Sequence, residues 1–275
     1  MSYTIKQAPD KSFQTKGDLL QFIRKNKEDL VNAKKLEYKE TKGSFSTNLN
    51  YKGFTPNIGN IKTDYIQVKA VINTTNIIDS HMDLHMPKLW NKTVKDNPNT
   101  IHLQSHKADF ENLLSSNAKQ YNEEFKFSDL GLDSEMKTIA NINEFVLHRK
   151  TNPLMFDRYV EGMVKEHSVG MRYVNIDLAY YDEDSQKEMD FFNEKKQYAV
   201  NPEVAEERGY FWVVSEAKKH EGSAVVFGSN SITPTLWVKD YEPNKSTQKE
   251  PLLITPEPLI LDTLEVKNII NSLKF

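Results

Sequence analysis

The chain has no cysteine in its 275 residues. This absence excludes disulfide bonds, thiolate catalysis and zinc sites that use cysteine ligands, and it suits a reducing compartment such as the cytosol. The net charge is only −3, from 36 basic and 39 acidic residues. So small an imbalance gives no general attraction to nucleic acids or anionic membranes, and we expect neither as a partner.

Long apolar runs are also missing. No run is long enough to span a bilayer, and no apolar signal region opens at Met1. The apolar fraction of 38% is modest for 275 residues, which favours one main domain with polar extensions. We place an N-terminal arm at 1–60, the main domain at 61–240, and a linker with a tail at 241–275.

The two arms have helical patterns of their own. Residues 15–38 predict an amphipathic helix, with Thr15 as its cap and Asp18 at the capping-box position. This helix either packs on the main domain or serves as a docking helix or propeptide. Residues 241–258 are rich in proline and lysine and predict a linker, and 264–273 predict a short terminal helix.

The main domain is predicted to be rich in strands. Residues 65–72 alternate and are rich in β-formers, so they form the first strand. We also expect a turn at 129–132, a helix beginning at Pro153, a helical acidic insertion on the surface at 182–207, and further strands at 138–142, 165–174, 210–214 and 224–227.

The segment DSHMDLHMP at 79–87 has the residue types of a metal site. If it is extended, Asp79, His81, Asp83 and His85 share one strand face. Neighbours on that face lie about 7 Å apart, too far for all four to bind one ion at about 2.1 Å. We therefore expect a polar loop here and no metal ion.

His102 and His106 also have a spacing that a zinc helix can use. However, Leu103 occupies the position where such an enzyme carries its general-base glutamate. The short segment follows a proline, which favours a strand. A metal-dependent hydrolase using His81, Asp83, His85, His102 and His106 remains an alternative function.

Three separated segments offer a nucleophile, a base and a carboxylate. They are IHLQSHK at 101–107, KEHSVGMRYV at 165–174 and HEGSAVVFGSN at 220–230. A serine hydroxyl becomes a useful nucleophile when an adjacent base takes its proton. Histidine suits that role near neutral pH, and a carboxylate behind the ring fixes its tautomer and stabilises the imidazolium.

These segments, with DSHMDLHMP before them, resemble the prohead maturation proteases of tailed phages. This serine protease family is related to the herpesvirus assemblins, and the resemblance covers roughly residues 66–236. The order and spacing of the motifs carry it. Departures are Met82 where a glycine is usual, Gly222 in place of a β-branched residue, and Gly228 with Ser229 in place of Pro-Ala.

The resemblance implies Ser168 as nucleophile, His106 as base and Glu221 as the orienting carboxylate. His220 is a reserve third member, because assemblins carry a histidine in that role. Backbone N–H groups of the loop containing Ser229 and Asn230 are the implied oxyanion hole. The implied fold is α+β, mostly β, with an antiparallel herpesvirus-protease-like barrel surrounded by helices, and no cofactor is implied.

The implied function is limited endoproteolysis during capsid maturation, inside a phage procapsid assembled in the host cytoplasm. The substrates would be the scaffold protein, the pro-segment of the major capsid protein and the protease itself. A homodimer or larger oligomer is compatible with this role. A non-catalytic capsid- or scaffold-associated protein that retains the fold is the other alternative.

Overall fold

The computed structural model describes residues 3–39 and 51–243. Its strands are β1 (Tyr38–Lys39), β2 (Asn57–Ile58), β3 (Tyr65–Thr74), β4 (Asp83–His85), β5 (Asn99–Gln104), β6 (Leu113–Lys126), β7 (Lys137–His148), β8 (Glu166–Tyr180), β9 (Tyr210–Val225) and β10 (Thr235–Asp240). Its helices are α1 (Lys16–Leu36), α2 (Asn91–Asp96), α3 (Pro153–Val160), α4 (Gln186–Lys196), α5 (Pro202–Arg208) and the short 3₁₀ helix η1 (Phe127–Leu130). No helix in these ranges is long and apolar enough to cross a membrane.

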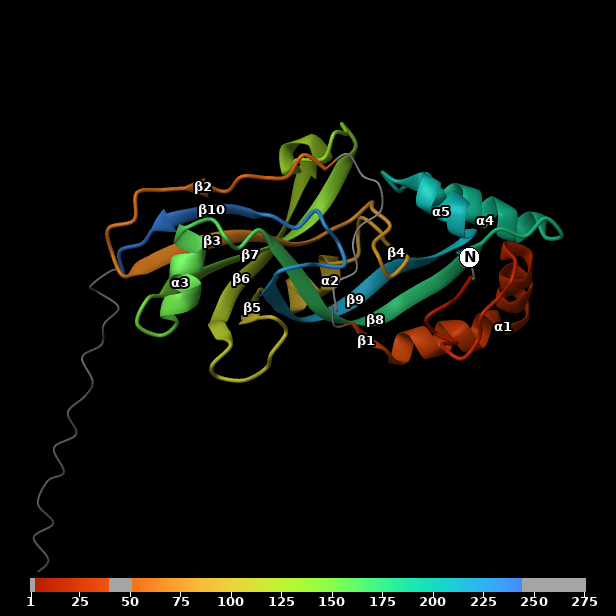
Figure 1. Ribbon diagram of the computed structural model, residues 1–275, viewed down its shortest axis with the longest axis horizontal. Coiled ribbons are helices and arrows are strands. Elements are labelled where there is room, and N and C mark those ends of the chain that lie inside the picture. The colour runs from red at the N-terminus through yellow and green to blue at the C-terminus, as the bar shows by residue number, and fades with distance from the viewer. Residues whose placement is uncertain (1–2, 40–50, 244–275) are drawn as a thin grey trace, which may run out of the picture. The chain divides into compact units, whose positions relative to one another are not determined.

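All ten strands belong to one sheet with the order β1-β8-β9-β5-β6-β7-β3-β10-β2, and β4 pairs with β9 (Figure 1). The α+β, mostly β class is confirmed. The expected antiparallel barrel is wrong for the described chain, because β4 and β5 run parallel to β9, β10 runs parallel to β2, and the sheet stays open. The end strands β1 and β2 have only two residues each, so neither offers a ladder long enough for closure.

The long β8–β9 pair is covered on both faces where β8 ends and β9 begins. Tyr210, Trp212 and Val214 belong to the core that also contains the apolar residues of α1, whereas Phe211 and Val213 belong to a second core. This alternation is the period-two pattern of a strand buried on both sides. The second core is completed by Phe192 of α4, by Val204 and Ala205 of α5, and by Ala199 between the two helices.

The acidic insertion at 182–207 is therefore helical as predicted, but it is not only a surface addition. Phe192 is 2% exposed and packs against Phe211, with ring centroids 5.4 Å apart. A few apolar residues of this acidic segment are buried in the second core, whereas Tyr198 is 40% exposed. Figure 1 shows α1, α4 and α5 at one end of β8–β9, with α3 at the other.

Helix α1 begins after Thr15, whose side chain forms the predicted capping box with Asp18. Its buried residues Leu19, Ile23 and Leu30 join the main core, so the helix packs on the main domain. The helix ends at Leu36, two residues earlier than predicted, because Tyr38 pairs with β8 as part of β1. The predicted linker beyond residue 243 and the terminal helix at 264–273 lie outside the described residues.

Other sequence predictions are confirmed in part. Strand 65–72 lies within β3, the turn at 129–132 overlaps the end of η1 and its C-cap Gly131, strand 138–142 lies within β7, and α3 begins at Pro153. The separate strands predicted at 210–214 and 224–227 are one strand, β9, which ends at Val225. Strand β6 was not predicted, because five of its fourteen residues are exposed and its apolar pattern is weak.

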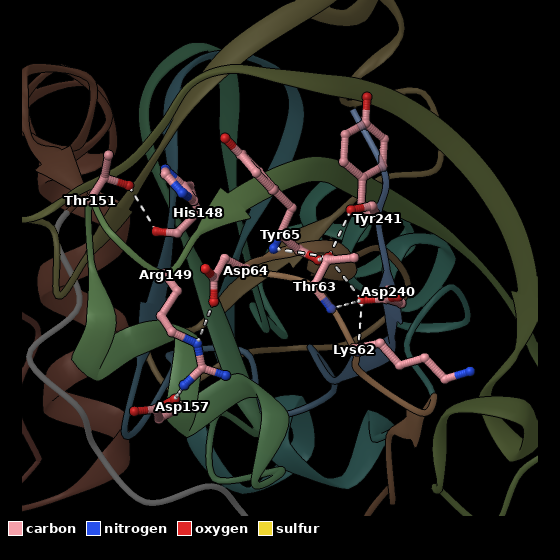
Figure 2. A network of polar contacts seen from close by, with 10 residues as sticks. All are labelled: Lys62, Thr63, Asp64, Tyr65, His148, Arg149, Thr151, Asp157, Asp240 and Tyr241. Carbon is pink, nitrogen blue, oxygen red and sulfur yellow. Dashed lines mark hydrogen bonds and ion pairs between the residues drawn. The ribbon is translucent and has the colours of Figure 1, made fainter. Parts of the chain in front are cut away.

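A polar network fixes the edge of the sheet near α3 (Figure 2). Arg149 follows β7 and bridges Asp64, 3.3 Å from its Nε, and Asp157 of α3, 2.6 Å from its Nη1. Asp240 at the end of β10 accepts hydrogen bonds from the backbone N–H and the hydroxyl of Thr63, both 2.9 Å long. These contacts hold α3 against the ends of β3 and β7, beside the groove described below.

Candidate active site

The three residues expected to form a catalytic triad come from neighbouring strands. Ser168 lies on β8, Glu221 on β9, and His106 two residues after β5, and β9 is hydrogen-bonded to both other strands. Ser223 of β9 is the register partner of Ser168 on one side and of Leu103 on the other. The sheet order thus brings together residues that are separated by up to 115 positions in the chain.

Register also decides which face each side chain occupies. Ser168 pairs with Ser223, and Gly170 pairs with Glu221. Directly opposed residues of an antiparallel pair share a face, as do residues two apart in one strand. Ser168, Ser223 and Glu221 therefore lie on the same face of the sheet.

His106 contacts Glu221 directly. Its Nδ1 lies 2.6 Å from Oε1 of Glu221, and the side chains are only 6% and 5% exposed. A carboxylate against Nδ1 assigns the ring proton to that nitrogen. In this tautomer Nε2 carries no proton, as a general base requires.

His106 is held in an unusual backbone conformation. Ser105 and His106 have φ values of 55° and 58°, and the N–H of Lys107 donates to the carbonyl of Gln104 at 3.1 Å. Two consecutive positive φ values in a four-residue turn define type I′, which normally uses Asn-Gly or glycine pairs. Strained non-glycine residues of this kind cluster at functional sites.

The loop after β9 packs against the strand that carries Ser168. The N–H of Gly228 donates to Glu166 at 2.8 Å, and a Cβ on Gly228 would lie 2.8 Å from the carbonyl oxygen of His167. Only glycine allows this close approach. The predicted oxyanion loop therefore lies beside the residue that precedes Ser168.

The side chain of Asn230 is occupied within this loop. Its Nδ2 donates to the carbonyl of Thr74 at 2.9 Å, and its Oδ1 accepts from Thr74 Oγ1 and from the N–H of Ile232, both at 3.1 Å. Ser229 is 6% exposed and accepts the N–H of Ser80 through its carbonyl at 3.1 Å. Asn230 therefore shapes the loop, and backbone N–H groups are the better candidates for holding an oxyanion.

No protein-family model, curated protein or solved structure matches the chain.

His220, the reserve third member, is exposed at the neighbouring position of β9. Its pKa is lowered, first by partial burial and then by the charges of Arg172 and Lys218. The register shifts at this point, because Gly170 faces Glu221 while Met171 faces Lys219. His220 is thus the extra residue of a β-bulge, and the carboxylate in contact with the His106 ring belongs to Glu221.

A groove of about 530 Å³ lies at the ends of the strands that carry the candidate triad, and its lining includes Ser105 and Glu166 but none of the three triad residues. It is bounded by the end of β5, the start of β8, the end of β9 and α3. Its walls are mostly apolar and include Met163, Val226 and Phe227, which are 60%, 78% and 50% exposed. Exposed apolar side chains gathered at one groove are typical of a binding surface.

A chain of buried polar groups lies on the opposite face of these strands. Asn143 Nδ2 donates to His102 Nδ1 at 3.1 Å, His102 Nε2 lies 3.4 Å from the Tyr159 hydroxyl, and that hydroxyl lies 3.2 Å from His167 Nε2. Burial lowers the pKa of both histidines, that of His167 to about 4. Gly222 leaves space for these buried polar groups, because a Cβ at this position would lie 2.6 Å from Asn143 Nδ2.

Lys219 extends the buried chain. Its Nζ donates to the amide oxygens of Asn141 and Asn143, both at 2.6 Å, and burial lowers its pKa to about 7. The sequence analysis missed this group. The available signal was the pair Asn141 and Asn143, two polar residues at inward positions of an otherwise apolar strand.

Asp79, Asp83 and His85 form a second cluster, with ligand-type atoms within 4.8 Å of one another. The expectation that they lie too far apart is wrong, because the segment turns back at Met82, which has a φ of 61°, and brings Asp79 beside Asp83. The cluster already has a cation nearby. Lys34 Nζ lies 2.9 Å from Asp83 Oδ1, and both side chains are 0% exposed.

The five residues of the metal-hydrolase alternative do not form a single group in the described chain. His102 belongs to the buried chain with Asn143 and Tyr159, whereas His106 contacts Glu221. His85 contacts Asn73, with its Nδ1 2.9 Å from Asn73 Nδ2. Within the described residues, the close group of three metal-type ligands is Asp79, Asp83 and His85.

Proposed function

We propose that this protein is a serine endopeptidase in which Ser168 attacks the peptide carbonyl, His106 accepts the serine proton and Glu221 orients the imidazole. The observation that carries the proposal is the 2.6 Å contact between His106 and Glu221, on the face that the strand register assigns to Ser168. A buried carboxylate behind a histidine, with a serine on the same face, is the arrangement that nucleophilic acyl transfer requires.

The proposed reaction proceeds in two halves. The Ser168 oxygen bonds to the carbonyl carbon while its proton passes to Nε2 of His106. That proton is then given to the departing amine as the C–N bond breaks. In the second half, water attacks the acyl carbon while His106 takes its proton, and the proton is then given to the Ser168 oxygen as the ester bond breaks. Glu221 stabilises the imidazolium in both halves.

Burial supports catalysis at this position. Ser168 is 4% exposed, and the side chains of His106 and Glu221 are nearly enclosed. Charges interact more strongly where water is excluded. The apolar groove at the ends of β5, β8 and β9 offers a surface for a polypeptide segment, which supports a peptide rather than a small ester as the substrate.

The resemblance to prohead maturation proteases gives the proposal its biological setting. In that setting the protein acts inside a phage procapsid in the host cytoplasm, and cleaves the scaffold protein, the pro-segment of the major capsid protein and itself.

Replacing the nucleophile tests the proposal. Co-expression of Ser168→Ala with the major capsid protein should leave it uncleaved by mass spectrometry, because loss of a triad member costs on the order of 10⁴-fold or more in rate. Ser215→Ala, which alters a serine of the neighbouring strand β9, is the matched control and should cleave normally. An unchanged fragment pattern from Ser168→Ala would favour the non-catalytic capsid-associated alternative instead.

A further inference from the structure

Ser223 stands between the three residues of the proposed triad. Its side chain is 0% exposed on β9, and it is the register partner of Ser168. Its hydroxyl donates to Oε2 of Glu221 at 2.7 Å. The hydroxyl oxygen of Ser223 also accepts a hydrogen bond from the backbone N–H of His106 at 3.1 Å. One hydroxyl therefore contacts both the carboxylate and the base.

The two oxygens of Glu221 have different partners. Oε1 faces the His106 ring, while Oε2 receives the Ser223 hydroxyl. A carboxylate held at both oxygens cannot rotate without breaking a hydrogen bond, and bonds to a charged acceptor are among the stronger ones. Ser223 thus fixes the plane in which Glu221 meets the imidazole.

The second contact acts on the backbone of His106. That residue lies in the strained type I′ turn, with a φ of 58°. The N–H of Ser105 donates to the carbonyl of Ala224 at 2.9 Å, and the N–H of His106 donates to Ser223. Two adjacent residues of β9 therefore hold the turn in its unfavourable conformation.

We propose that Ser223 is a positioning residue that sets the geometry between His106 and Glu221 through its single hydroxyl. This inference rests on the proposed protease function. The hydroxyl has one hydrogen to donate, and that hydrogen is directed to Glu221. Because that hydrogen is already held by Glu221, Ser223 acts through its neighbours and does not attack the substrate.

Kinetics of Ser223→Ala on a cleavable peptide form the first test. Loss of the hydroxyl lets the base and the carboxylate drift, and misplacement of about 1 Å can cost on the order of 10²-fold in rate. We expect kcat to fall by about that factor while KM stays within twofold, because the groove is unchanged. An unaltered kcat in a folded variant would overturn the inference.

A fluorophosphonate probe distinguishes the two serines. Peptide mapping should place the label on Ser168 in both the wild-type protein and Ser223→Ala, with slower labelling in the variant. Label on Ser223 would overturn the positioning role by making this residue the nucleophile. Ser215→Ala, elsewhere on β9, should be labelled at the wild-type rate.

A spectroscopic readout is independent of activity. In a Ser168→Ala background, the NMR signal of the His106 Nδ1 proton should be protected by its contact with Glu221. Adding Ser223→Ala should increase its exchange with water at least tenfold, and equal exchange rates would overturn the inference. Cleavage by Ser168→Ala alone would instead refute the proposed triad with Ser168 as its nucleophile, so the two failures are distinguishable.

Discussion

Glu221 and His106 meet through a 2.6 Å contact between Oε1 and Nδ1, although 115 residues separate them in the chain. The contact exists because β5 runs parallel to β9, with Gln104 paired to Ala224. The turn after β5 then brings His106 back toward Glu221, three residues earlier on β9. A carboxylate in this position can influence cleavage through its charge as well as through its shape.

Glu221→Gln separates charge from shape. The amide keeps the size of the side chain and can still hydrogen-bond to His106, but it cannot stabilise an imidazolium. We expect the proposed peptidase to lose on the order of 10³- to 10⁴-fold in kcat. The measurement is steady-state cleavage of a peptide from the capsid pro-segment. Glu216→Gln on the same strand is the control, and similar rates for the two variants would contradict the role of Glu221.

The strained turn predicts a stabilising substitution. Ser105 has a φ of 55°, a conformation that asparagine adopts more readily than serine. Ser105→Asn should therefore raise the free energy of unfolding by up to about 1 kcal/mol. Urea denaturation measures the change. Ser116→Asn, at an exposed position of β6, should give no gain, and a destabilised Ser105→Asn protein would contradict the strain argument.

Local patterns in the sequence were sufficient for several parts of this site. The alternation around Ser168 predicted a strand, and each triad candidate belonged to a short motif of its own. These features are local because a strand face repeats every two residues. The pairing of β5 and β8 with β9 depends on the sheet order, which local periodicity does not encode.

Other features had no local signal. The type I′ turn at Ser105 and His106 contains neither asparagine nor glycine, the residues that normally indicate it. Met82 likewise turns the chain where a glycine would have been expected. In both places tertiary contacts override the backbone preference of the residue. The buried charge of Lys34 was hidden for a related reason, since a lysine near a helix end normally indicates a solvated position.

The buried histidines predict loss of stability in acid. His167 has its pKa lowered by burial to about 4, below the value of about 6.5 expected in the unfolded chain. The unfolded state therefore binds the proton first as the pH falls. The stabilisation is fully present above about pH 6.5 and is lost as the pH falls toward 4.

For His167 alone the expected loss is about 3 kcal/mol, and His102 changes stability in the same direction because burial also lowers its pKa. Urea denaturation at a series of pH values between 7 and 4 measures the slope. His167→Gln should flatten it, since glutamine does not titrate. An identical slope in the variant would show that another group causes the loss of stability between pH 7 and pH 4.

The last prediction concerns Lys34, the one fully buried lysine of α1. Its Nζ lies 2.9 Å from Asp83 Oδ1, with the rings of Tyr173 and Trp212 centred 5.1 and 5.5 Å away. The Tyr173 hydroxyl donates to the other oxygen of Asp83 at 2.5 Å. Lys34→Met would leave Asp83 as a buried charge without its cation, so we expect a loss of about 3 to 5 kcal/mol in the free energy of unfolding.

A second substitution and an exposed pair make this test specific to the buried charge. Adding Asp83→Asn to Lys34→Met removes the uncompensated charge while Tyr173 can still donate to the amide oxygen, so most of the loss should be recovered. Lys52→Ala breaks the pair with Asp133, whose side chains are 73% and 64% exposed, and should cost less than about 1 kcal/mol. If Lys34→Met is no more damaging than Lys52→Ala in urea denaturation, the Lys34–Asp83 pair does not anchor α1 to the sheet.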